Sequence, residues 1–255
     1  MMNPPLKDWH HKHVWIIGAS SGIGLALAKL LTSLNAKVSV SARSENLLND
    51  FVNTHPNSQA FALDVTQPAA LSLAFQKLSE NLAIDLIIYC AGHYSPMRAQ
   101  DFNLDESRKH LEINYLGALN LLGACLPTLT HQRSGHIAFI SSVAGYSGLP
   151  KSLAYGPTKA ALIHLAEVLY LDLHPSGVGV SIINPGFVET PLTAQNSFHM
   201  PALITADLAA KEIIYGFERG DFEIHFPKRF SRFLKLLRIL PYRLYFAIVS
   251  KFTGL

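Results

Sequence analysis

The sequence predicts an α/β fold in which a doubly wound parallel sheet of about seven strands is flanked by helices on both faces. Short apolar runs alternate with segments of helical spacing, and each run is apolar throughout instead of alternately polar. Strands covered on both faces have this pattern, because crossover helices lie on either side of a parallel sheet. A glycine-rich segment between the first run and the first helix is the second indication. At 255 residues we expect one domain over 1–255, with a basic amphipathic C-terminal extension at about 228–255.

The first half of the chain contains four predicted strands and three predicted helices. The strands are the apolar or β-branched runs at 13–19, 37–43, 59–65 and 84–92. The helices, at 22–34, 44–55 and 66–82, have apolar residues at helical spacing. In the third helix Thr66 is the expected N-cap, and Pro68 lies in the first turn, where its missing N–H is tolerated.

The second half continues the alternation. A long helix is expected from about 105 to 129 and another at 154–173, with strands at 135–145, 177–186 and 221–227. No element is assigned between 187 and 220. Because crossovers between parallel strands are right-handed, the strands should form a Rossmann-type sheet. Ligands of such sheets bind beyond the carboxyl ends of the strands, and the motifs below fall at those ends.

The composition excludes several classes of protein. With 49% hydrophobic and 15% charged residues the chain is too apolar to be disordered, and a net charge of +3 gives no argument for nucleic acid. Two cysteines are too few for a disulfide framework, which favours a reducing, cytoplasmic location. Neither a signal segment nor a spanning run is recognised. The histidines at 10–13 have no partners at ligand spacing, so no metal is predicted.

The segment "GASSGIG" (18–24) follows the first predicted strand and opens the first helix. Glycines let the backbone approach a pyrophosphate, and the helix N-terminus supplies free N–H groups and a partial positive charge. A strand before the loop and a helix after it are the context that this motif requires. The residues expected to hold the phosphates are Gly18, Ser20, Ser21, Gly22, Ile23 and Gly24.

The end of the second strand indicates which dinucleotide is bound. An NAD site has an acidic residue there, which binds the ribose 2′-hydroxyl. Here Ala42 occupies that place, and Arg43 and Ser44 follow. An arginine just before a helix opposes the helix dipole unless an anion lies over it, and a 2′-phosphate is such an anion. We therefore predict NADP(H) in preference to NAD(H), held by Arg43 and Ser44; a solvated surface arginine is the alternative.

Tyr155 and Lys159 are four residues apart and share one face of a predicted helix. Pro157 is tolerated only in the first turn, so Tyr155 lies at the start of that helix. A phenol with a pKa of about 10 is a poor acid or base at neutral pH, and a nearby cation lowers that pKa. The pair is therefore predicted to exchange a proton with a carbonyl/alcohol couple. The alternative is that Tyr155 packs and Lys159 extends to solvent.

Two further polar positions accompany this pair. Ser142 ends the strand segment "ISSVAG", and Asn114 interrupts the otherwise apolar face of the long helix. A buried polar group requires a partner, so Asn114 is either paired structurally or holds a water molecule.

With these motifs in order, the sequence resembles the short-chain dehydrogenase/reductase family over about residues 12–225. The resemblance rests on "GASSGIG", "CAG" (90–92), Asn114, Ser142, the Tyr155–Lys159 pair and "INPGFVETP" (183–191). It implies that Tyr155 is the general acid/base and that Lys159 lowers its pKa and holds the nicotinamide ribose. It further implies that Ser142 orients the substrate carbonyl and that Asn114 positions a water connecting Lys159 to solvent.

The resemblance also implies contacts along the rest of the dinucleotide. The acid at the end of the third strand would face the adenine, unless it only starts a turn, and "CAG" would let a ribose lie against the backbone. The backbone at Val188 and the hydroxyl of Thr190 would fix the carboxamide. These expected contacts are Asp64, Val65, Cys90, Ala91, Gly92, Pro185, Gly186, Val188 and Thr190. The family often has "NAG" where this chain has "CAG", so Cys90 removes a polar group near the ribose.

The predicted function is NADP(H)-dependent reduction of a hydrophobic ketone or aldehyde, or oxidation of the matching secondary alcohol. Loops after the strands should line an apolar, aromatic substrate pocket. Its expected residues are His93, Tyr94, Met97, Tyr146, Leu149, Phe187, Phe198 and Met200. A non-catalytic NADP(H) sensor is the alternative of another class, and an epimerase or dehydratase on the same scaffold is a third.

The C-terminal segment departs most from the family pattern. Phe230, Phe233, Leu234 and Leu237 are expected on one side of a helix, with Lys228, Arg232, Lys235 and Arg238 on the other. This pattern fits a flap over the pocket, a subunit interface, or a helix lying on the inner face of an anionic membrane. A homodimer or homotetramer, formed through the helices around Asn114 and Tyr155, is what the resemblance implies.

Overall fold

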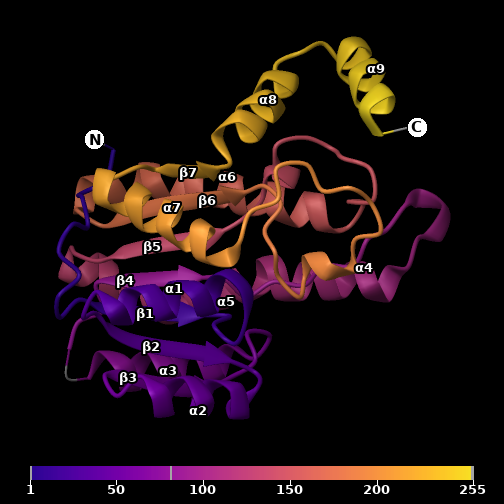
Figure 1. The fold of residues 1–255 in the computed structure, drawn as a ribbon. Coiled ribbons are helices and arrows are strands. Elements are labelled where there is room, and N and C mark those ends of the chain that lie inside the picture. Colours follow the sequence, from indigo (N-terminus) through magenta and orange to yellow (C-terminus); the bar gives the residue numbers. More distant parts are fainter. Residues whose placement is uncertain (1, 81, 254–255) are drawn as a thin grey trace.

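The structure of the chain is a computed structural model that describes residues 2–80 and 82–253. Its central feature is a sheet of parallel strands in the order β3-β2-β1-β4-β5-β6-β7 (Figure 1). The chain runs outward from β1 to β3 and then crosses back to β4, so the strand order reverses between β1 and β4. This is the doubly wound arrangement, and the predicted fold class is confirmed.

The strands are β1 His13–Ile17, β2 Lys37–Ala42, β3 Ser58–Ala62, β4 Leu86–Tyr89, β5 His136–Ile140, β6 Gly179–Pro185 and β7 Glu223–Phe226. The helices are α1 Gly22–Ser33, α2 Glu45–Thr54, α3 Pro68–Ser79, α4 Leu104–Leu111, α5 Gly117–Gln132, α6 Tyr155–Leu173, α7 Ala206–Arg219, α8 Lys228–Arg238 and α9 Tyr242–Thr253. Each predicted strand overlaps an observed one, and the predicted ends differ from the observed ends by at most five residues.

Helices cover both faces of the sheet, which explains why the strands are apolar without alternation. In β1, Trp15 and Ile17 pack with residues of α3, α5 and α6 on one face. Val14 and Ile16 face the other way and pack with residues of α1, α2 and α7. The carboxyl ends of all strands point to the same edge, where the connecting loops enclose the site described below.

Three local features differ from the expectations. Helix α7 lies in the stretch to which no element was assigned, with the Thr205 side chain as its N-cap and Gly220 in the left-handed conformation at its end. Thr66 is not the N-cap of α3, because its hydroxyl donates to Asp64 and Gln67 takes the cap position. The long helix expected at about 105–129 is interrupted by a π-helical turn at Glu112–Leu116, which separates α4 from α5.

Helices α8 and α9 form a C-terminal hairpin (residues 228–253) that projects from the β7 edge of the sheet (Figure 1). Its inner side is anchored by buried Leu234, Leu237 and Tyr245. Phe233 does not share that side, contrary to the expected apolar face, and its side chain is 41% exposed. Within the described residues, no helix combines the length and apolarity needed to cross a membrane.

Candidate active site

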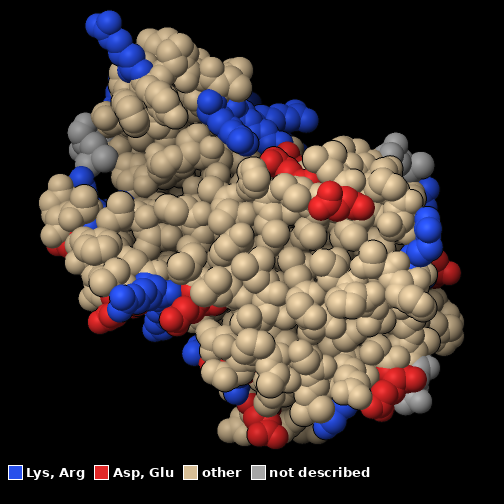
Figure 2. All heavy atoms as spheres, turned by 180° about the vertical axis from the view of Figure 1, so that it is seen from behind, with Lys and Arg blue, Asp and Glu red and all other residues tan. Residues whose placement is uncertain are grey.

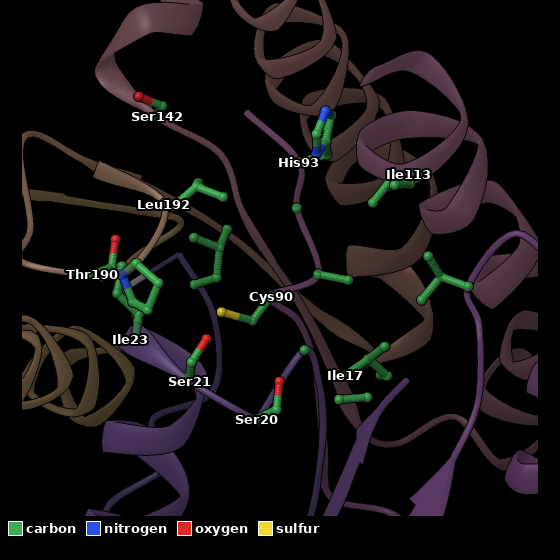
Figure 3. A pocket seen from close by; sticks show the side chains of 18 of the residues that line it. Ile17, Ser20, Ser21, Ile23, Cys90, His93, Ile113, Ser142, Thr190 and Leu192 are labelled. Carbon is green, nitrogen blue, oxygen red and sulfur yellow. The ribbon is translucent and has the colours of Figure 1, made fainter. Parts of the chain in front are cut away.

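A cleft of about 480 Å³ opens at the carboxyl edge of the sheet. Loops that follow six of the strands, β1 to β6, contribute to its walls together with the start of α6. In Figure 3, Ser20 and Ser21 lie along one wall, Thr190 and Leu192 along another, and the Cys90 thiol projects between them.

Most of the sequence-predicted site residues line this one cleft. They are Gly18, Ser20, Ser21, Gly22, Ile23, Arg43, Ser44, Asp64, Val65, Cys90, Ala91, Gly92, Ser142, Tyr155, Lys159, Pro185, Gly186, Val188 and Thr190. Gly24 and Asn114 are not part of the lining, and each has a packing role described below.

Two positions of the glycine loop, Gly18 and Gly24, leave no room for a side chain. Gly18 has a φ of +93°, and a Cβ there would lie 2.4 Å from the backbone nitrogen of Ala91. A Cβ on Gly24 would lie 2.2 Å from the carbonyl oxygen of Gly18, so this glycine permits close packing of the helix on the loop rather than contact with a ligand. Both positions require glycine for reasons of space.

The start of α1 presents unused backbone donors to the cleft. Ser21 occupies the N-cap position but makes no side-chain cap hydrogen bond, and the first turn contains no acidic residue. The leading N–H groups of such a helix have no intrahelical partner and, with the helix dipole, favour an anion. Thr190 closes this side of the cleft, since its Cγ2 would lie 2.9 Å from a Cβ on Gly22. The cradle fits the pyrophosphate of a dinucleotide.

The end of the cleft beside β2 and β3 carries one basic side chain, Arg43. Arg43 and Ser44 both line it, and Arg43 is exposed and forms no ion pair with another described residue. Asp64 accepts hydrogen bonds from the backbone nitrogen and the hydroxyl of Thr66, both at 2.9 Å. Its carboxylate therefore starts a turn, as one of the two alternatives stated, while also lining the cleft.

Tyr155 and Lys159 lie at the start of α6 and face the cleft together. The Lys159 ammonium donates a hydrogen bond of 2.9 Å to the carbonyl of Ile140 and lies 5.4 Å from the centroid of the Tyr155 ring. Burial lowers the pKa of Lys159 to about 8. Burial also raises the pKa of Tyr155, and a hydrogen bond with Ser142 lowers it in part. The net direction is opposite to the lowering expected from Lys159, because desolvation of the phenolate dominates.

The two serines that end β5 point in different directions. Ser141 is buried and donates to the carbonyl of Lys159 at 2.8 Å, so its hydroxyl holds α6 against the strand end. Ser142 lines the cleft, and its Oγ accepts from the backbone nitrogen of Ala144 at 3.1 Å. Ser142 is therefore the hydroxyl available to a substrate oxygen near Tyr155.

Asn114 lies in the π-helical turn and is fully buried. Its amide oxygen accepts from the backbone nitrogen of His93 at 2.6 Å, and its Nδ2 donates to the His93 carbonyl and to the Thr158 hydroxyl, both at 3.0 Å. The side chain thus ties the loop after β4 to the helix that bears Tyr155 and Lys159. Of the two alternatives stated for its side chain, structural pairing is what these bonds show.

A family model described as short chain dehydrogenase matches residues 12–200. An uncharacterized oxidoreductase of Myxococcus xanthus is 31% identical over 251 residues, which cover 96% of this chain and 99% of that protein. The chain belongs to the short-chain dehydrogenase family. It is an oxidoreductase of the NAD(P)-dependent, short-chain type, as its motifs predicted.

Solved structures have the same fold. A short chain dehydrogenase from Burkholderia cenocepacia in complex with NADP superposes with a TM-score of 0.84 at 22% identity, covering 95% of this chain and 98% of that chain. ElxO with bound NADP gives a TM-score of 0.76 at 23% identity, covering 84% and 97%. At 22% and 23% sequence identity, these structures show that the fold is shared and nothing more specific.

Beside the short-chain dehydrogenase motifs lies a cluster that the sequence reasoning missed. His93 Nε2 is hydrogen-bonded to the Glu106 carboxylate, and the His110 ring lies 4.7 Å from that of His93. His110 donates from Nδ1 to the Glu106 carbonyl at 2.7 Å and accepts at Nε2 from the backbone nitrogen of Ser95 at 3.0 Å. Both ring nitrogens of His110 are therefore occupied, which argues against a metal ligand there. The spacing of Glu106 and His110, one helical turn apart, is the signal in the sequence.

Of the residues expected to line a substrate pocket, only His93 is part of the cleft lining. The ring of Tyr94 packs edge-on against that of Tyr155 with centroids 4.9 Å apart, and its hydroxyl donates to Asn196 at 2.8 Å. Phe187 follows the cleft residue Gly186 and contacts the ring of Phe198 at 5.8 Å between centroids. Met97 is buried. Tyr94, Phe187 and Phe198 therefore form aromatic contacts near the cleft without being part of its lining.

Glu223 connects the hairpin to one of these loops. Its Oε1 accepts from the Tyr146 hydroxyl at 2.5 Å and from Asn184 at 2.9 Å, while its Oε2 accepts from Lys235 of α8 at 2.5 Å. Burial opposes ionisation, but the bonds from Lys235 and Tyr146 outweigh it and hold the pKa of Glu223 below its ordinary value. Tyr146 lies four residues after Ser142. The Glu223 carboxylate therefore connects α8, β6 and the loop that follows Ser142 through hydrogen bonds.

Proposed function

We propose that this short-chain dehydrogenase uses NADP(H) to reduce a hydrophobic ketone or aldehyde, or to oxidise the matching secondary alcohol. The proposal depends on one observation: Tyr155, Lys159 and Ser142 line the same cleft as the glycine loop and the free N-terminus of α1. A protein that only sensed the dinucleotide would have no use for an acid/base group beside it.

The bound dinucleotide would supply the hydride. The Ser142 hydroxyl would donate a hydrogen bond to the substrate carbonyl and orient it toward Tyr155. Tyr155 would then deliver its phenolic proton to the carbonyl oxygen as the alcohol forms. A raised pKa keeps this phenol protonated at neutral pH, which suits the direction of reduction. The Lys159 ammonium, 5.4 Å from the ring, would stabilise the phenolate that remains and bond the nicotinamide ribose.

The preference for NADP(H) is supported by the basic end of the cleft. Arg43 is exposed at the carboxyl end of β2 and unpaired among the described residues, so a 2′-phosphate would find a bidentate donor there. The structural neighbours from Burkholderia cenocepacia and ElxO were both solved with NADP, which agrees with this choice.

A second copy of the chain is a proposed partner. Apolar side chains are exposed along α6, where Val168 is 42% and Leu171 is 72% exposed. Burying such a surface against its symmetry mate would favour a dimer or tetramer. Light scattering of the purified chain and of Leu171→Arg tests this, since the variant should shift toward the monomer.

The deciding experiment is a screen of NADPH and NADH oxidation against hydrophobic ketones, aldehydes and quinones. Turnover of at least one carbonyl with NADPH, lost in Tyr155→Phe, is the expected result. Tight NADPH binding without turnover of any carbonyl, in either direction, would favour the sensor instead.

A further inference from the structure

We propose that the C-terminal hairpin (residues 228–253) docks the protein on an anionic lipid surface and so presents the substrate cleft to molecules dissolved in that surface. The docking rests on charge and exposure alone. The statement about substrates also rests on the proposed function.

The charge of the hairpin is of one sign. It contains seven of the 21 Lys and Arg residues and none of the 18 Asp and Glu residues, so the remainder of the chain is slightly acidic. Lys235 is paired with Glu223, which lies outside the hairpin. Arg229, Arg232, Arg238 and Arg243 are exposed and form no ion pair with another described residue. Anionic headgroups provide the complementary charge.

Large apolar side chains of the hairpin are exposed as well as these arginines. Ile239 is 76%, Tyr242 79% and Phe252 75% exposed, and Leu236 is 55% exposed. Figure 2 shows the projecting part of the molecule as apolar or neutral surface interrupted by basic side chains. Helices that lie in the headgroup region have this combination, in which apolar side chains insert and cationic ones reach the phosphates.

The exposed apolar residues of the hairpin do not belong to the core, because other residues of the same two helices are the buried ones. Leu234, Leu237 and Tyr245 already anchor the hairpin on the body of the protein. The rings of Phe233 and Phe252, with centroids 6.0 Å apart, bring α8 and α9 together on the outer side. Exposed Leu236, Ile239 and Tyr242 are therefore not among the buried residues that hold the hairpin on the body of the protein.

The anchored side of the hairpin lies against the substrate loops. The Tyr245 hydroxyl donates to the carbonyl of Gly148 at 2.5 Å, in the loop that follows Ser142. Phe230 packs near Phe187, with ring centroids 5.9 Å apart, next to the cleft residue Gly186. A docked hairpin would hold the cleft entrance close to the lipid. The substrate class is therefore a lipophilic carbonyl or alcohol that partitions into membranes.

The first experiment measures sedimentation of the full chain with vesicles, without dinucleotide or substrate. Phosphatidylcholine vesicles are compared with vesicles that also contain phosphatidylglycerol, at low and high salt. We expect sedimentation with the anionic vesicles and its loss at high salt. Arg229→Gln combined with Arg232→Gln should weaken partitioning by about tenfold or more, as should Leu236→Glu combined with Ile239→Glu.

Matched controls lie elsewhere on the surface. Lys29→Gln with Lys77→Gln removes two exposed positive charges from α1 and α3, and Leu47→Glu with Leu73→Glu changes two exposed leucines of α2 and α3. These variants should sediment nearly as the parent does. Equal sedimentation of all variants, binding indifferent to anionic lipid, or no binding at all would overturn the proposal. So would a change of oligomeric state in the hairpin variants with vesicle binding unchanged, since that outcome identifies a subunit interface.

A second arm tests the substrate class. NADPH oxidation is measured with a long-chain ketone in anionic vesicles and with a short, water-soluble ketone in buffer. The hairpin variants should slow the first reaction and leave the second unchanged; an equal effect on both would refute the link to lipid-dissolved substrates. If no carbonyl is reduced, the proposed function fails, while the sedimentation result still decides the docking.

Discussion

The Lys159 ammonium donates to the carbonyl of Ile140 at 2.9 Å, so a buried cation bonds the end of β5 beside Tyr155. Burial lowers its pKa from 10.5 to about 8. Between those values the unfolded chain binds more protons than the folded one, so stability must rise with pH.

We predict that this pH dependence disappears in Lys159→Met. From pH 8 to pH 10.5 the parent should gain on the order of 3 kcal/mol of unfolding free energy relative to the variant, because neutral lysine no longer resists burial. Urea unfolding at several pH values measures the difference. A constant difference across that range would show that Lys159 titrates as an exposed lysine does.

Tyr155→Phe removes the proposed proton donor and leaves the ring that packs against Tyr94. We expect turnover to fall by about a thousandfold, the scale of general acid catalysis, with NADPH affinity retained. Lys159→Ala should impair both turnover and affinity, since it loses the proposed ribose contact as well. Steady-state kinetics and fluorescence titration separate the two effects. Near-parental turnover in Tyr155→Phe would reject the assignment.

Arg43→Ala should change the cofactor preference. Loss of a charge-assisted bond to the 2′-phosphate is expected to lower kcat/KM for NADPH by about 10- to 100-fold and leave that for NADH nearly unchanged. The measurement is kcat/KM with each dinucleotide at a fixed carbonyl concentration. An equal loss with both dinucleotides would mean that Arg43 acts on the fold or on the shared diphosphate.

Gly24→Ala should destabilise the protein, because its Cβ would lie 2.2 Å from the carbonyl oxygen of Gly18 and neither backbone can give way. The expected loss is about 1–3 kcal/mol or more, seen as a lower urea midpoint. Gly123→Ala is the matched control in α5, since a Cβ there has open space and alanine favours the helix by about 1 kcal/mol. Similar effects of the two substitutions would contradict the packing role of Gly24.

Much of the fold could be predicted because its signals are local. Strands buried on both faces are apolar runs, and a glycine loop between a strand and a helix marks the first turn. Helix α7 was also within reach, since Thr205 caps its start and Gly220 ends it in the left-handed conformation. The exposure of Phe233 was not, because helical periodicity shows which residues share a side but not how wide the buried strip is.

Most residues that line the cleft could be predicted from the sequence, but the direction of the pKa shift of Tyr155 could not. The i, i+4 spacing places Tyr155 and Lys159 together, but the direction of the ammonium depends on Ile140, a residue 19 positions away. Likewise, no sequence pattern predicts the π-helical turn at Glu112–Leu116. The only sequence feature that drew attention to this segment was the polar Asn114 in an apolar helix face. His93 and Glu106 meet only because the loop after β4 returns over α4.

The Glu223 carboxylate is a mechanical link as well as an ion-pair partner. It accepts hydrogen bonds from Lys235 of the hairpin and from Tyr146 of the loop that follows Ser142, so a displacement of one of these residues affects the other. Free-energy coupling of this kind acts equally in both directions. If binding of the hairpin to a lipid surface raises the affinity of the cleft for its substrate, then bound substrate must raise the affinity of the hairpin for that surface by the same factor.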